Sequence, residues 1–209
     1  LFLECFNEEE PQINVIGGGK MAKALVAGFV NSGFINKSNI FICTRSEATA
    51  KSWRSQGFTS AYPKDVFYSE VKKPRAIILI AIKPQMFPSF ISEVKANEWF
   101  YFGLPGILCI SIMSGISLQH FDKETGKPHF QIPPIAMSVG FDGHSMRLMP
   151  NVNCAVSSGT LVLSADSETP QELVELVSVL SSYVGKCIRV DEAHFNAASS
   201  ISGCGPAFV

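Results

Sequence analysis

Three glycines stand where an apolar run gives way to an amphipathic stretch. In INVIGGGKMA, residues 13–22, Gly17, Gly19 and Ala22 have the spacing G-x-G-x-x-A. In dinucleotide-binding folds the first glycine permits a tight turn, the second lets the backbone approach a pyrophosphate, and the third small residue lets helix and strand pack closely. The unpaired N–H groups of the following helix attract phosphates. We predict a dinucleotide site here, the competing interpretation being a glycine turn that only joins strand to helix.

The end of the second apolar run indicates which dinucleotide binds. Thr44, Arg45 and Ser46 follow the run at 40–43, where an NAD site usually carries an Asp or Glu for the ribose 2′-hydroxyl. Arginine and hydroxyl groups bind a 2′-phosphate that a carboxylate would repel. The sequence therefore predicts NADP as the cofactor, with NADPH preferred over NADH. Glu47 lies one residue further and would weaken the preference, and an ordinary solvated Arg45 is the competing interpretation.

A third segment, AIKPQ at 81–85, closes the apolar run that begins at residue 76. It should lie at the carboxyl edge of the sheet, where open α/β folds bind their ligands. We therefore expect Lys83, with the chain direction fixed by Pro84, to border the cofactor ribose. A plain turn proline is the alternative.

The spacing of apolar residues predicts the elements that carry these segments. Continuous apolar runs at 13–16, 40–43, 76–82 and 107–112 suit strands buried on both faces of a parallel sheet. Between and after them, 3.6-residue periods predict helices at 20–32, 85–96 and 169–185. The alternation predicts an α/β fold with a Rossmann-like, doubly wound parallel sheet. We expect a long loop at 126–145, a dinucleotide-binding domain over 1–190, and the beginning of a second, helical domain over 191–209.

Composition excludes several classes of function. The 209 residues carry a net charge of −1, which provides no basic field for nucleic acid or for an anionic membrane. The apolar runs are far shorter than the roughly 20 residues of a membrane span. The six cysteines are scattered without metal-ligand spacing, so we predict neither a metal nor disulfides. The acidic N-terminus favours a cytoplasmic protein, and a mitochondrial location stays open if residues precede Leu1.

Five motifs in order, VIGGGKMA, AIKPQ, SIMSG, RLMPN and SISGCGPAF, resemble pyrroline-5-carboxylate reductase, the NAD(P)H-dependent enzyme of the last step of proline biosynthesis. The resemblance runs from about residue 12 to the end of the chain. It implies a Rossmann-like domain followed by an all-helical dimerisation domain, and a homo-oligomer at full length. Because the chain begins with Leu and stops within an apolar segment, we expect it to be truncated at both ends.

The resemblance also implies which residues form the sites. The substrate, pyrroline-5-carboxylate, would be bound by Ser202, Gly203, Cys204 and Gly205, where two glycines beside Pro206 would form a small anion-binding nest. Our catalytic candidates are Glu192, Ser202 and Cys204. The cofactor would be bound by Ile16, Gly17, Gly18, Gly19, Lys20, Met21, Thr44, Arg45, Ser46, Ala81, Ile82, Lys83 and Pro84.

Reduction of a cyclic imine needs a hydride donor beside the C=N carbon and a proton for the nitrogen. Positioning supplies most of such catalysis, so no nucleophile is required. Glu192 is our candidate for orienting the imine nitrogen or passing its proton. The alternative is a first-turn glutamate that only favours the helix dipole.

Two departures from the family pattern keep other functions open. Cys204 replaces the usual middle serine of S-G-S-G-P, and Val152 replaces a threonine after M-P-N. A binding protein that kept the NADP site but lost the reaction, or an inactive fragment, is therefore the alternative to a reductase. A hydroxy-acid dehydrogenase would explain the glycine loop but not SISGCGPAF, and it would need a catalytic lysine on a later helix, where the sequence shows none.

Overall fold

The computed structural model describes residues 12–61, 76–96, 107–125 and 143–207. These residues form one eight-stranded sheet in the order β3-β2-β1-β4-β5-β6-β7-β8. The first six strands of this order are parallel, β6 and β7 pair antiparallel, and β7 and β8 are parallel again. The strands are β1 (Gln12–Ile16), β2 (Ile40–Cys43), β3 (Thr59–Ala61), β4 (Ala76–Ile80), β5 (Ile107–Ser111), β6 (His144–Met149), β7 (Gly159–Ala165) and β8 (Gly185–Arg189).

The order 3-2-1-4-5-6 is that of the Rossmann fold, so the predicted doubly wound α/β sheet is confirmed. The antiparallel extension through β7 and β8 was not predicted as such. The extension lies at one edge of the sheet, away from the point where the strand order reverses, which is between β1 and β4. That reversal leaves a crevice at the carboxyl ends of the strands, where such folds bind ligands.

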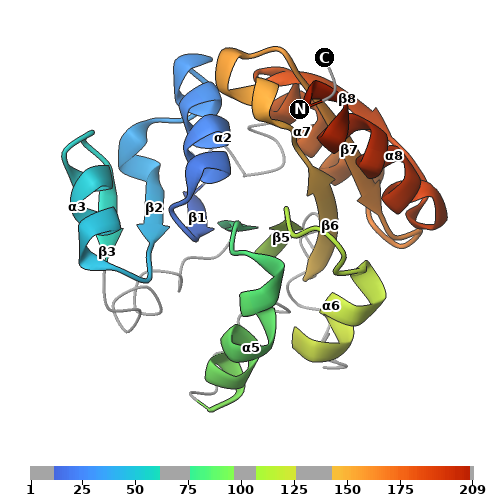
Figure 1. The fold of residues 1–209 in the computed structure, drawn as a ribbon, viewed down its shortest axis with the longest axis horizontal. Helices are drawn as coiled ribbons and strands as arrows, with labels where there is room; N and C mark the ends of the chain where they lie inside the picture. The colour runs from blue at the N-terminus through green and yellow to red at the C-terminus, as the bar shows by residue number, and fades with distance from the viewer. Residues whose placement is uncertain (1–11, 62–75, 97–106, 126–142, 208–209) are drawn as a thin grey trace, which may run out of the picture.

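Helices cover both faces of the sheet (Figure 1). Helices α2 and α7 lie on one face, and α5 and α6 lie on the other. Helix α8 packs against β7. The helices are α2 (Lys20–Asn31), α3 (Glu47–Arg54), α5 (Phe87–Ala96), α6 (Leu118–Thr125), α7 (Gln171–Ser182) and α8 (Glu192–Cys204), with short 3₁₀ turns at Lys37–Asn39, Pro84–Met86, Val152–Val156 and Gly205–Ala207.

Two apolar cores lie on opposite faces of the sheet, as continuous apolar strands require. One joins β1 residues such as Val15 to Leu25 of α2 and Leu176 of α7. The other joins Ile78 of β4 to Phe90 of α5 and neighbouring aromatic rings. The sheet is thus packed on both faces, and this packing positions the ends of its strands.

The predicted loop at 126–145 is partly outside the described residues, which resume at residue 143. Its last two residues belong to β6, so the loop prediction was wrong there. The reason is that Ser145 and Arg147 are polar yet buried in β6, which hides the apolar pattern of a strand. The domain boundary near residue 190 stays a prediction.

Candidate functional site

Gly17 makes the turn at the end of β1. Its φ of +106° is unfavourable for any residue with a side chain, and a Cβ there would lie 2.5 Å from the carbonyl oxygen of Ala81. The Gly17 N–H donates to the carbonyl of Cys43 over 2.9 Å, and the Ala81 N–H donates to the carbonyl of Ile16 over 2.8 Å. The glycine therefore lets the ends of three strands meet.

At Gly19 the lack of a side chain has a different physical role. Gly19 caps α2 with extended backbone, and a Cβ on Gly19 would meet nothing within 4 Å. The first turn of α2 contains no acidic residue, so its unpaired N–H groups and positive dipole end are not neutralised. This cradle fits a phosphate group, which binds helix N-termini of this kind.

The end of β2 is built around the start of α3. Thr44 donates its hydroxyl to the carbonyl of Ser46 over 3.0 Å, and the Ser46 hydroxyl accepts the backbone N–H of Thr49 over 3.3 Å, as an N-cap does. Arg45 is exposed, and its Nη1 lies 3.4 Å from the sulfur of Met86. The side chain therefore reaches across toward the segment that follows β4.

Glu47, which we expected to weaken 2′-phosphate binding at Arg45, is not an isolated charge. Its carboxylate forms an ion pair with Arg54, at the other end of α3. Both side chains are about two-fifths exposed, so water screens the pair and its contribution to stability is small. The pair still places the positive charge of Arg54 beside the Glu47 carboxylate. This offsets the negative charge that we expected to weaken a 2′-phosphate site.

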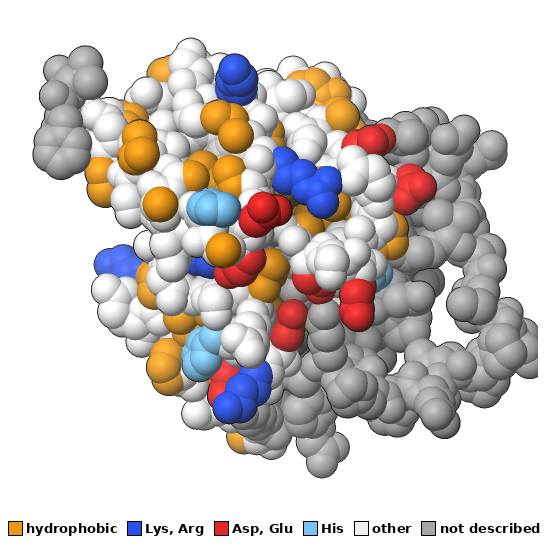
Figure 2. Space-filling model, turned by 90° about the vertical axis from the view of Figure 1, so that its right-hand side faces the viewer, with side chains coloured by type: hydrophobic (Ala, Val, Ile, Leu, Met, Phe, Trp, Pro, Cys, Tyr) orange, Lys and Arg blue, Asp and Glu red, His pale blue; other side chains and the backbone are white. Residues whose placement is uncertain are grey.

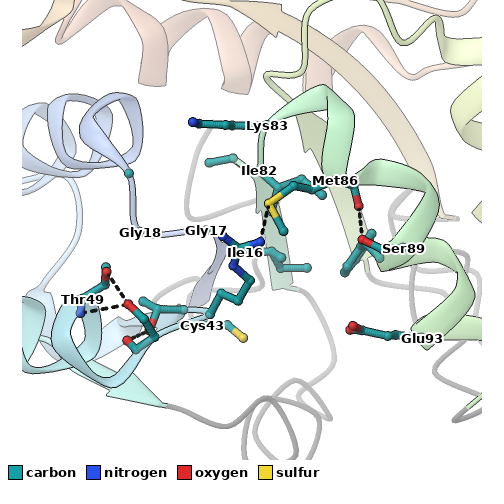
Figure 3. Close-up of a pocket in the computed structure, with 16 residues that line it drawn as sticks. Ile16, Gly17, Gly18, Cys43, Thr49, Ile82, Lys83, Met86, Ser89 and Glu93 are labelled. Carbon is teal, nitrogen blue, oxygen red and sulfur yellow. Dashed lines mark hydrogen bonds between the residues drawn. The ribbon is translucent and has the colours of Figure 1, made fainter.

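A cavity of about 540 Å³ opens between these segments, at the switch point of the sheet (Figure 3). Its size suits a small-molecule or cofactor site. Lys20, Met21 and Pro84 of the predicted cofactor residues do not line it. The predicted residues that do are Ile16, Gly17, Gly18, Gly19, Thr44, Arg45, Ser46, Ala81, Ile82 and Lys83.

The far wall of this cavity was not predicted from the sequence. Met86, Ser89, Phe90 and Glu93 line it from the segment after β4, and Thr49 lines it from α3. Met86 and Phe90 fall on the apolar period of the helix predicted at 85–96, which marks core residues as readily as a cavity wall. Proximity to the K-P turn was the one signal that could have singled them out.

The C-terminal motif lies at a second cavity, of about 750 Å³. Ser202 and Gly205 line it, whereas Gly203 and Cys204 do not. The nest prediction was wrong in its geometry, because α8 continues through Cys204 and Gly205 has helical dihedrals. A nest requires a left-handed residue beside a right-handed one, and neither glycine has a positive φ. The substrate and catalytic roles of these residues stay predictions.

Glu192 begins α8 and is tied to the sheet. Its Oε1 accepts Nη1 of Arg147 at 2.6 Å and the backbone N–H of Leu118 at 3.1 Å. Arg147 is 2% exposed, stacks 4.0 Å from the centroid of Phe195, and donates from Nη2 to Asn196 over 3.3 Å. The contacts connect β6, α6 and α8 at one point, so Glu192 has a positioning contact whatever its chemical role.

Three of the described cysteines are held as neutral thiols by their surroundings. Burial raises the pKa of the Cys109 thiol, as it does for Cys154 and Cys187, so all three stay protonated at neutral pH. Within the same described residues, no group of three metal-ligating side chains occurs. None of the described helices has the length and apolar character needed to cross a membrane.

Comparison with known proteins gives a consistent picture. A model of the family described as "NADP oxidoreductase coenzyme F420-dependent" matches residues 12–115, which span the glycine loop and both other cofactor segments. The pyrroline-5-carboxylate reductase of Arabidopsis thaliana is 27% identical over 203 residues, covering 96% of this chain and 64% of the plant enzyme. This chain is similar to the pyrroline-5-carboxylate reductases. It spans less than two thirds of the length of the plant relative.

Solved pyrroline-5-carboxylate reductases share the fold. The enzyme of Coxiella burnetii superposes with a TM-score of 0.77 at 23% identity, covering 96% of this chain and 66% of that one. The pyrroline carboxylate reductase of Plasmodium falciparum, solved with NADP bound, superposes with a TM-score of 0.70 at 22% identity, covering 96% and 65%. The Rossmann-like architecture is therefore shared over nearly the whole of this chain.

Proposed function

We propose that this chain carries the cofactor half of an NADPH-dependent pyrroline-5-carboxylate reductase, which reduces L-1-pyrroline-5-carboxylate to L-proline. The observation that carries the proposal is the cavity at the switch point, where a bare glycine cradle and Arg45 face the same space. The likeness to pyrroline-5-carboxylate reductases along the chain supports the reaction. NADH is the weaker alternative as cofactor.

NADPH, when bound, supplies the hydride that reduces the imine carbon. The chain's own groups would hold it in place. Gly19 and the start of α2 would bind the pyrophosphate, because a Cβ on Gly19 would meet nothing within 4 Å and the first turn of α2 carries no acidic side chain. Arg45 and Ser46 would bind the 2′-phosphate, and Lys83 would border the ribose beside the glycine loop (Figure 3).

At the imine end, Glu192 would orient the substrate nitrogen. Arg147 and the Leu118 amide occupy Oε1, whereas Oε2 has no hydrogen-bond partner among the described residues. Oε2 is buried and keeps its acceptor capacity, which an iminium N–H would use on reaching it. Ser202 and Cys204, also predicted to act on the substrate, lie near the other end of α8, roughly 15 Å from Glu192 at 1.5 Å of rise per residue. They and Glu192 are therefore alternative positions for the imine along α8.

We further propose a homo-oligomer at full length. The face formed by β8 and α8 carries hydrophobic side chains among charged ones (Figure 2). Ile201 is 77% exposed and Ile188 is 41% exposed there, and exposed apolar clusters mark association surfaces. Sedimentation of the full-length protein tests this, with a monomer at all concentrations as the contrary result. The helical domain from residue 191 and a cytoplasmic location are parts of the same proposal.

The test of the reaction is NADPH oxidation by the full-length protein with and without pyrroline-5-carboxylate. We expect oxidation that depends on the imine and yields one proline for each NADPH consumed. NADPH binding without imine-dependent oxidation would contradict the reductase and favour the alternative, a binding protein that lost the reaction. In that case Cys204 and Val152 are the first positions to restore to serine and threonine.

A further inference from the structure

Trp53 reaches the glycine loop from α3, although it does not line the cavity. Its indole Nε1 donates to the carbonyl oxygen of Gly18 over 3.2 Å. The side chain is 1% exposed, so this donor lies in the interior and is aimed at the centre of the loop. A buried indole N–H needs an acceptor, and here the acceptor is the backbone of the loop itself.

The indole is held firmly in this position. Phe58 packs edge-on against its ring, with centroids 5.1 Å apart at 84°. The ammonium group of Lys23, on α2, lies 5.7 Å from the ring centroid and donates to the hydroxyl of Ser52 on α3 over 3.1 Å. Helices α2 and α3 are thus joined around the tryptophan, and the loop between β1 and α2 is included in the contact.

The loop has no room for a side chain at Gly18. A Cβ on Gly18 would lie 2.5 Å from Nε1 of Trp53 and 2.9 Å from the methyl carbons of Thr44 and Thr49. The indole therefore packs directly on the backbone of the loop. Gly18 lacks a side chain so that Trp53 can pack on the loop, whereas the open space at Gly19 leaves room for the ligand.

This hydrogen bond has a consequence for the next amide. The peptide group between Gly18 and Gly19 is planar, and in a trans peptide the carbonyl and the N–H point in opposite directions. A donor that fixes the Gly18 carbonyl on the α3 side consequently directs the Gly19 N–H away from α3. Gly19 lines the cavity, and an oriented amide dipole binds an anion without reorganisation on binding.

The structure assigns to Trp53 the role of a positioning residue for the cofactor: its indole N–H fixes the Gly18–Gly19 peptide so that the Gly19 amide meets the pyrophosphate. The inference rests on the proposed NADPH site and adds a residue outside the cavity to it. Trp53 acts through the loop and does not touch the cofactor.

The test compares Trp53→Phe with Phe58→Leu in the full chain. Trp53→Phe keeps an aromatic ring but removes the donor, whereas Phe58→Leu loosens the same packing and keeps the donor. We expect Trp53→Phe to raise the Kd for NADPH roughly three- to tenfold, the usual effect of losing one hydrogen bond. Phe58→Leu should lower Tm and change the Kd less than about twofold, in line with a lost packing contact alone.

A second measurement leaves Trp53 in place. The chain has two tryptophans, so the indole N–H signal of Trp53 in a ¹⁵N-labelled sample is identified by Trp99→Phe, which removes the other one. We expect NADPH to shift the Trp53 signal and to slow its hydrogen exchange. NADPH binding that leaves this signal unmoved, or that is equal in wild type and Trp53→Phe, would overturn the inference alone. A wild-type chain that does not bind NADPH, judged by calorimetry, would overturn the proposed function as well.

Discussion

At the scale of single residues, Gly17 and Gly19 are bare for different reasons, and substitution should separate them. We expect Gly17→Ala to lower the free energy of unfolding by at least about 2 kcal/mol, because of its positive φ and the close Ala81 carbonyl. Gly19→Ala should cost less than about 1 kcal/mol, since space is open at that position. Urea unfolding measures both.

The Gly19 variant should also separate cofactor binding from stability. Gly19→Ala should remain folded and yet bind NADPH at least about tenfold more weakly, because its methyl group would occupy the space of the phosphate. Unchanged NADPH affinity in Gly19→Ala would contradict the proposed position of the pyrophosphate. Circular dichroism of both variants shows whether the fold is retained.

Arg45 is the residue on which cofactor choice depends. We expect Arg45→Ala to raise the Kd for NADPH about tenfold or more, because charge-assisted hydrogen bonds to the 2′-phosphate are lost. The Kd for NADH should change less than about twofold. Lys51→Ala removes an exposed positive charge from α3 and serves as the control. Equal weakening of NADPH and NADH by Arg45→Ala would disagree with a 2′-phosphate contact.

At the scale of elements, Arg147 joins β6 to α8. We expect Arg147→Met to lower the free energy of unfolding by about 2–3 kcal/mol, because Glu192 would be left without its partner. This lies at or below the low end for buried pairs, since Glu192 is about one third exposed. Arg189→Met, which loses an exposed hydrogen bond to Gln171, should cost less than about 0.5 kcal/mol. Similar losses in both variants, measured by urea unfolding, would count against a buried structural pair.

The elements also show what the sequence could predict. Strands β1, β2, β4 and β5 were predicted correctly, because each is a continuous apolar run buried on both faces. Strand β6 was missed because buried Ser145 and Arg147 interrupt its pattern. The partner of Arg147 lies 45 residues away in α8, and local periodicity carries no information about such a contact.

The same distinction holds for the site. Gly17 to Gly19, Thr44 to Ser46 and Ala81 to Lys83 were found because each segment is a local motif at the end of a strand. Trp53, Met86 and Glu93 were not found, because they reach the site through the packing of α3 and of the segment after β4. Their placement depends on tertiary structure, which spacing along the chain does not encode.

At the scale of the whole molecule, the buried thiols make stability depend on pH. Burial raises the pKa of Cys109, Cys154 and Cys187 above the ordinary value of 9.0 in the folded state. Above that pH the unfolded chain releases these protons, whereas the folded chain keeps them. The unfolded state therefore binds fewer protons than the folded state, and the free energy of unfolding falls as pH rises. Below about pH 8 both states are protonated and the thiols have no effect.

We therefore expect the stability, followed as Tm, to decline between about pH 8.5 and about pH 10. Fully buried Cys109 should contribute up to about 1.4 kcal/mol per pH unit, and Cys154 and Cys187 should act in the same direction. Cys109→Ala should decline less steeply, although its stability at neutral pH is lower because of the cavity it leaves. The slopes, rather than the absolute values, are compared by thermal unfolding. An identical slope in the variant would show that Cys109 is not responsible.

The central claim is that the switch-point cavity holds NADPH, and calorimetric titration of the chain with NADPH and with NADH tests it most directly. The structure predicts one NADPH site per chain, with NADPH bound at least about tenfold more tightly than NADH through Arg45. Absence of NADPH binding, or tighter binding of NADH, would contradict the claim.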